Sequence, residues 1–120
     1  MNDEGGYAFV YQPQGCCMMV DLKKMKEFSF MDENTFLYGE ELILGERMIE
    51  KDYKCVCCLK CDVIHNHSKT VKSVLSKRRI LKINNESLNY YMKNYRQFNA
   101  FQRYICLLFN SMKWLILVSR

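Results

Sequence analysis

Residues 31–68 read MDENTFLYGEELILGERMIEKDYKCVCCLKCDVIHNHS, and this stretch decides most of the fold. An acidic pair, Glu40-Glu41, opens a helical pattern, and a cysteine-rich apolar run follows it. Two histidines one residue apart, His65 and His67, close the stretch. Carboxylates and imidazoles move protons and hold metals near neutral pH. We therefore expect a helix–strand unit that brings the two kinds of side chain together.

The residues that follow the acidic pair have helical spacing. Residues 40–51 predict a helix whose first turn carries both carboxylates, where the helix dipole favours negative charge. Leu44, Met48 and Ile49 fall on one face of this helix, and we expect them to be buried. The remaining charged side chains of the helix are expected to be solvated.

Several short segments are expected to form strands. Residues 7–11 alternate between aromatic and smaller side chains, which is a strand pattern. Residues 15–20 form an apolar run led by glycine, and residues 54–58 and 61–65 predict two short buried strands. Asp21 is expected to cap a short helix, because its carboxylate accepts hydrogen bonds from amides two or three residues on.

The C-terminal part predicts helices with a basic surface. One helix is expected over residues 71–82, with a break at Asn84-Asn85 and a second helix from Glu86. Between residues 69 and 103 there are nine Lys or Arg and a single acidic residue. Such a balance favours phosphate-rich or anionic partners. A last helix presents an apolar stripe made of Phe101, Tyr104, Ile105, Leu108, Met112 and Leu115.

Composition limits the class of protein. The chain has 120 residues, of which 49% are hydrophobic, which is enough for one small folded domain. We divide it into residues 1–70 and a basic, apolar helical tail over residues 71–120. No run reaches the roughly 20 apolar residues needed to span a bilayer. Seven cysteines, an odd number, follow a start without signal-peptide character, so we expect reduced thiols and a cytoplasmic location.

Four pieces occur in an order that resembles the C-terminal, acceptor-side part of a family 2 inverting glycosyltransferase. The similarity covers roughly residues 7–70. The pieces are the glycine-led run 15–20, the segment FMDENTFLYGEE over residues 30–41, the helix through residues 47–54, and VIHNHS over residues 63–68. The resemblance implies an α+β fold, a partial GT-A-like arrangement with a few short strands, a helix after the acidic pair and a helical tail.

The resemblance also implies roles for the acidic pair. In the family the second acid of this pair is the usual candidate for the base that deprotonates the acceptor hydroxyl, and that position is Glu41 here. Glu40, Gly15 and Tyr38 are implied as substrate-binding residues. The family commonly has Glu-Asp at the pair and another Asp two residues later, where this chain has Ile43. The chain therefore resembles a variant branch of the family.

The departing diphosphate of such a transfer needs a positive group beside it. The resemblance implies Mg²⁺ or Mn²⁺, with His65 or His67 near the metal or the diphosphate. No Asp-x-Asp occurs in the chain, and nothing in it matches the family's N-terminal nucleotide-binding half. We therefore expect a fragment of a longer enzyme, or a truncated gene product, that does not turn over a sugar nucleotide alone. The parent enzyme would join a sugar from a nucleotide sugar to a glycan or lipid-linked acceptor, in surface polysaccharide synthesis.

Three alternatives stay open. The exposed edge at residues 7–11 would suit a non-catalytic module that forms a homodimer. A zinc module would use the cysteines 55, 57, 58 and 61 with the two histidines, although we favour these cysteines as small buried apolar residues. The last helix, with its basic neighbours, would suit packing on the body of the fold or on a second copy of the chain, or peripheral contact at the inner face of a membrane. No nucleic-acid motif accompanies the basic run, so no nucleic-acid partner is expected.

Overall fold

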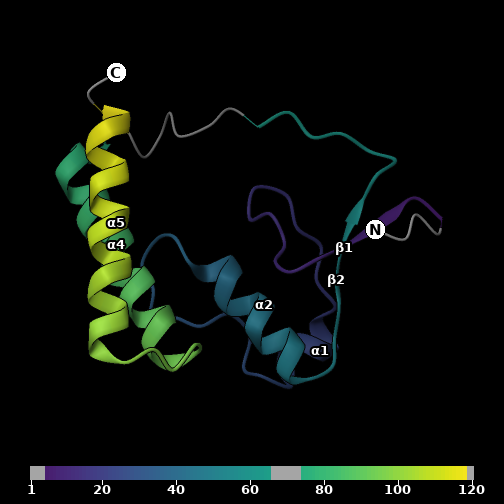
Figure 1. The fold of residues 1–120 in the computed structure, drawn as a ribbon. Helices are drawn as coiled ribbons and strands as arrows, with labels where there is room; N and C mark the ends of the chain where they lie inside the picture. Colours follow the sequence, from purple (N-terminus) through teal and green to yellow (C-terminus); the bar gives the residue numbers. More distant parts are fainter. Residues whose placement is uncertain (1–4, 66–73, 119–120) are drawn as a thin grey trace. The chain divides into compact units, whose positions relative to one another are not determined.

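The computed structural model describes residues 5–65 and 74–118 (Figure 1). Within these ranges the fold combines four helices with a two-stranded antiparallel sheet, which confirms the mixed class predicted from the sequence. The chain divides into two compact units. The first consists of Met1–Asp32 with Glu40–His67, and the second consists of Glu33–Gly39 with Ser68–Arg120.

The sheet of the first unit joins β1 (Tyr7–Val10) to β2 (Cys55–Cys58). Tyr7 pairs with Cys58 at one end of the ladder and Val10 with Cys55 at the other. The strand predicted over residues 7–11 is therefore confirmed, as is the strand predicted over residues 54–58. Burial is different from the expectation: Val56 is exposed, because two strands alone leave most of their side chains uncovered.

Two other predicted strands are not formed. Residues 15–20 make a turn and then an irregular segment, and the amide of Cys17 donates to the carbonyl of Gln14 at 3.3 Å. Residues 61–65 are likewise irregular, and Ile64 is 94% exposed. Apolar runs of this length become strands only where a neighbouring strand supplies ladder hydrogen bonds, and neither run has such a neighbour among the residues that the structure describes.

The core of the first unit lies between its two helices. α1 (Leu22–Lys26) begins as predicted at Asp21, whose carboxylate accepts from the amides of Lys23 at 2.9 Å and Lys24 at 3.4 Å. Met25 of this helix and Phe28 pack with Leu44 of α2 (Glu40–Glu50). Partly buried side chains surround these three: Met18, Met31, Met48 and Tyr53.

The helix predicted over residues 40–51 is confirmed to within one residue, but its buried face is wider and turned from the one expected. Leu44 is buried as predicted, and Met48 is half-buried. Ile43 is also buried, whereas Ile49 is 53% exposed. The guanidinium of Arg47 donates to the carbonyls of Phe28 and Phe30 and so fixes the loop that follows α1 against this helix.

The second unit is built on α4 (Lys77–Asn94) and α5 (Ala100–Val118), which lie side by side (Figure 1). The predicted break at Asn84-Asn85 is wrong, because α4 runs through both residues without interruption. The side-chain amide of Asn110 donates to Asn84 Oδ1 and to Asn85 Oδ1, each at 2.8 Å. These polar side chains are therefore satisfied between the helices instead of competing for the backbone.

Segment Glu33–Gly39 is attached to the second unit through α4. Ser87, which is buried, donates from its hydroxyl to the carbonyl of Leu37 at 2.8 Å. Gly39 has φ +87°, and a Cβ there would lie 3.6 Å from Ser87 Cβ. The left-handed backbone is therefore the reason that glycine is favoured at this position, since a Cβ there would make only an ordinary contact with α4.

The apolar stripe predicted on the last helix is present where its side chains are described, and part of it faces solvent; the side chain of Leu115 lies outside the described ones. Six apolar side chains of α5 are exposed: Phe101, Tyr104, Leu108, Phe109, Met112 and Ile116. Of the remaining predicted members, Ile105 is half-buried. In the described residues, no helix combines the length and the apolar character needed to cross a membrane.

Candidate active site at the start of helix α2

The predicted acidic pair forms the first turn of α2. The chain enters this helix through two residues with left-handed backbone, Tyr38 at φ 67° and Gly39 at φ 87°. Glu40 and Glu41 follow directly and occupy the positive end of the helix dipole. The sequence thus located the acidic turn correctly.

The structure brings Gly15 against Glu41. A Cβ added at Gly15 would collide with the Glu41 carboxylate and would lie 3.1 Å from its Cδ. Four residues along the same helix, a Cβ at Gly45 would lie 2.5 Å from the carbonyl oxygen of Tyr11. Positions 41 and 45 share one face of a helix, so the segment after β1 runs along that face and reaches the carboxylate at Gly15.

Glu40 has the more perturbed environment of the two acids. Burial raises the pKa of its carboxyl above the ordinary value of 4.5, and the charge of Glu41 adds to this, while the Glu40 backbone amide opposes it. Its Oε2 is buried, and no hydrogen-bond partner for it occurs within the described part of the chain. A buried, unpaired carboxylate oxygen is costly, and an incoming hydroxyl that donates to it would remove that cost.

The remaining residues predicted for the site are Tyr38, His65 and His67. Tyr38 is half-buried and belongs to the second unit. His65 is exposed in the irregular segment after β2, so the expected strand that would point the two histidines to one side is absent there. His67 lies outside the described residues. The roles assigned to the two histidines stay predictions.

The cysteines are not buried as expected. Cys55 is half-buried and burial raises its pKa, whereas Cys57, Cys58 and Cys61 are exposed. The interpretation of these residues as buried apolar side chains is therefore wrong: within the described residues β2 has one partner strand, and Cys61 lies in the irregular segment after it. In residues 5–65 and 74–118, no group of three or more His, Cys, Asp or Glu is arranged to hold a metal ion.

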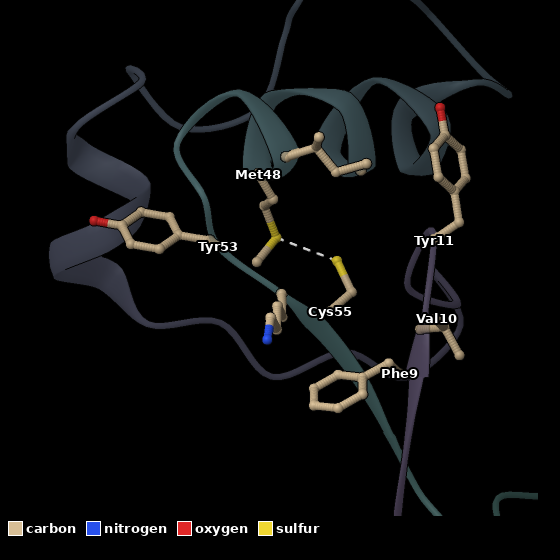
Figure 2. A pocket seen from close by; sticks show the side chains of 9 residues that line it. Phe9, Val10, Tyr11, Met48, Tyr53 and Cys55 are labelled. Carbon is tan, nitrogen blue, oxygen red and sulfur yellow. Dashed lines mark hydrogen bonds between the residues drawn. The ribbon is translucent and has the colours of Figure 1, made fainter. Parts of the chain in front are cut away.

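A pocket of about 210 Å³ lies between α2 and the sheet, and sequence reasoning missed it (Figure 2). Met48 and Cys55 point toward one another across it, with their sulfur atoms 3.3 Å apart. The Lys54 ammonium lies 5.0 Å from the centre of the Phe9 ring. The full lining is Phe9, Val10, Tyr11, Gly45, Met48, Ile49, Tyr53, Lys54 and Cys55. The pocket could have been suspected from the sequence, because Gly45, Met48 and Ile49 are spaced to share one face of the predicted helix.

Comparison of the chain with protein-family models, curated proteins and solved structures found no match.

Proposed function

We propose that this chain is the acceptor-side part of an inverting glycosyltransferase with a GT-A-like fold, in which Glu41 is the base. The observation that supports the proposal most is the contact between Gly15 and Glu41. These residues come from two of the separate pieces that resemble the family. A shared site requires the two pieces to meet, and a small packed domain without a site does not.

The chemistry assigned to the acidic pair is a single displacement. Glu41 accepts the proton of the acceptor hydroxyl as its oxygen attacks the anomeric carbon, and the bond to the diphosphate breaks on the opposite side. Glu40 accepts a hydrogen bond from a second hydroxyl of the acceptor through its unpaired Oε2. His65 or His67, with Mg²⁺ or Mn²⁺ when bound, would stabilise the charge on the departing diphosphate.

The nucleotide sugar requires further protein beyond these residues. The sequence contains no Asp-x-Asp, so we propose that a nucleotide-binding half, in the same protein or in a second chain, completes the enzyme. The chain alone is then expected to be inactive with UDP-, GDP- and dTDP-sugars in the presence of Mn²⁺. Robust turnover by the 120 residues alone would contradict this part of the proposal.

The test of the proposal is a comparison of two carboxylates on the same helix. The coding DNA upstream of Met1 is read, any in-frame extension is expressed with the chain, and transfer is assayed with the same donors and Mn²⁺. Glu41→Gln should lower the rate by about 10²–10⁴-fold, which is the usual contribution of a general base. Glu50→Gln, an exposed change at the end of α2, is the matched control and should leave the rate unchanged. Equal activity of the two variants would refute Glu41 as the base.

A second candidate function follows from the exposed stripe of α5, and we propose an anionic membrane surface as its partner. Aromatic and aliphatic side chains on one helix, with basic residues around them, suit the headgroup region of a bilayer. Residues 77–118 contain eight Lys or Arg and one acid, Glu86, which pairs with Lys82 at 3.7 Å. This charge favours anionic lipid over a second copy of the same basic helix pair.

Vesicle sedimentation distinguishes these partners. The chain should sediment with vesicles that contain phosphatidylserine and not with pure phosphatidylcholine, and Phe101→Ser with Phe109→Ser should abolish binding. Val56→Ser is the control, because it removes an exposed apolar side chain from the sheet. A different result would assign the stripe to a second copy of the chain. In that case the parent chain would not bind vesicles, and light scattering would show a dimer for the parent chain but not for the α5 variant.

A further inference from the structure

The sequence Cys58-Leu59-Lys60-Cys61 forms an anchored turn at the end of β2. The Leu59 amide donates to the carbonyl of Gly6 at 2.9 Å, which continues the ladder by one bond. The aliphatic part of Lys60 lies over Gly6, where a Cβ would be 2.9 Å from its Cδ and Cγ. Gly6 has φ +85°, a left-handed backbone conformation that favours glycine. The turn is therefore held against the start of β1.

Several donors converge on the sulfur of Cys58. The backbone amides of Lys60 and Cys61 and the thiol of Cys61 all hydrogen bond to it, and the Lys60 ammonium is close enough to act on its charge. These groups lower the pKa of the Cys58 thiol, the Lys60 amide most of all. The same thiol–thiol contact is the largest cause of the raised pKa of Cys61. Both side chains are exposed.

We propose that Cys58 and Cys61 are a redox-active dithiol, a modification site at which a small disulfide such as oxidised glutathione drives formation of an intrachain disulfide. The Cys61 thiol interacts with the Cys58 sulfur, two residues of an anchored turn separate the two cysteines, and both side chains are exposed. A contacting, exposed pair with one thiolate-stabilising environment is the arrangement found in reactive Cys-x-x-Cys turns. The proposal is independent of sugar transfer.

The chemistry is a pair of thiol–disulfide exchanges. The Cys58 thiolate attacks one sulfur of oxidised glutathione, the glutathione S–S bond breaks, and one glutathione thiolate leaves. Cys61 gives its proton to water and attacks Cys58 Sγ in the mixed disulfide, which releases the second glutathione thiolate. The protein loses two electrons and forms one S–S bond, while one glutathione disulfide is reduced to two thiols.

Neighbouring cysteines are poorer partners for Cys58. Cys57 is adjacent along the strand, so its side chain points to the opposite face of the sheet from that of Cys58. Cys55 is half-buried beside the Met48 sulfur. Cys17 lies near Cys61, since its charge contributes to the raised pKa of that thiol, and it is the competitor that an experiment must exclude.

Peptide mapping gives a direct test because trypsin cleaves between the two cysteines, after Lys60. The chain is equilibrated with glutathione and oxidised glutathione, free thiols are blocked with iodoacetamide, and the digest is analysed by mass spectrometry. In the Cys55→Ser, Cys57→Ser double variant, peptides 55–60 and 61–69 should appear linked, and dithiothreitol should release them. Cys58→Ser or Cys61→Ser, each added to that variant, should abolish the link.

Alkylation rates give a second readout that does not depend on the disulfide. At pH 7 and under reducing conditions Cys58 should react with iodoacetamide faster than Cys57, which is also exposed, because the thiolate is the nucleophile. Cys61→Ser should change the Cys58 rate and leave that of Cys57 unaltered. The proposal is overturned if the oxidised chain shows no 58–61 link, or if Cys17 is the residue joined to Cys61.

Discussion

Replacement of Gly45 by alanine tests the packing beneath the candidate site. Helix propensity alone predicts a gain of about 1 kcal/mol, because alanine is favoured over glycine inside a helix. The structure predicts the opposite sign. The new methyl would lie 2.5 Å from the Tyr11 carbonyl oxygen and 3.4 Å from its carbon, and both are backbone atoms that move only with the whole segment. Such overpacking costs about 1–3 kcal/mol.

Movement of Tyr11 would also disturb its hydroxyl, which donates to the Glu46 carboxylate, at a further cost of about 1 kcal/mol. The net expectation is a destabilisation of about 1–3 kcal/mol for Gly45→Ala. The assay is amide hydrogen exchange of α2, because Trp114 lies on α5 and reports on the other unit. Glu50→Ala, an exposed change on the same helix, should stay within about 0.5 kcal/mol. Slower exchange of α2 in Gly45→Ala than in the parent chain would refute the close approach between position 45 and the Tyr11 carbonyl.

Three further changes probe the remaining contacts. Arg47→Lys should destabilise the first unit by about 1–2 kcal/mol in hydrogen exchange, since an ammonium cannot bridge the carbonyls of Phe28 and Phe30 as the guanidinium does; unchanged exchange around α1 would contradict this. Glu40→Gln should stabilise the chain at pH 7 by up to about 1 kcal/mol. Burial raises the folded-state pKa of Glu40, so its ionised form destabilises the folded chain above that pKa. The advantage of Gln should therefore vanish as the pH falls below 4.5. An equal difference between the two chains in urea melts at pH 7 and below pH 4.5 would disprove this prediction. Asn110→Ala should destabilise the second unit by about 1–2 kcal/mol, because the side-chain oxygens of Asn84 and Asn85 lose their donor. Urea melts followed by Trp114 fluorescence measure the change. A midpoint shift no larger than that of an exposed control variant would count against this hydrogen-bond network.

Local chemistry predicted the helices of the first unit well. The Asp21 cap and the acidic turn at Glu40 each mark a helix start through interactions within a few residues. Strands were harder, because the run over residues 15–20 has the same apolar character as β2 but pairs with no strand in the described part of the chain. The break assigned at Asn84-Asn85 failed for a related reason: its polar side chains are satisfied by Asn110, 25 or more residues away.

The candidate site was predictable in its residue types and only partly in its geometry. The resemblance singled out Gly15 and Glu41, and their close contact depends on packing that composition does not show. The unpaired Oε2 of Glu40 and the pocket between α2 and the sheet both arise from tertiary contacts, so spacing could suggest them but not establish them. The reactive environment of Cys58 depends on a backbone turn that a two-residue spacing permits without requiring.

The hydroxyl of Ser87 that holds Leu37 has a practical consequence for anyone who wishes to divide the protein. The polypeptide leaves the first unit after Asp32, returns at Glu40 and leaves again after His67. A single scission near residue 67 would therefore separate the strip Glu33–Gly39 from the helix on which it rests. When the two halves are expressed separately, the C-terminal half should contain Ser87 without the Leu37 carbonyl that accepts its hydrogen bond. The N-terminal half should contain residues 33–39 without the helix on which they pack.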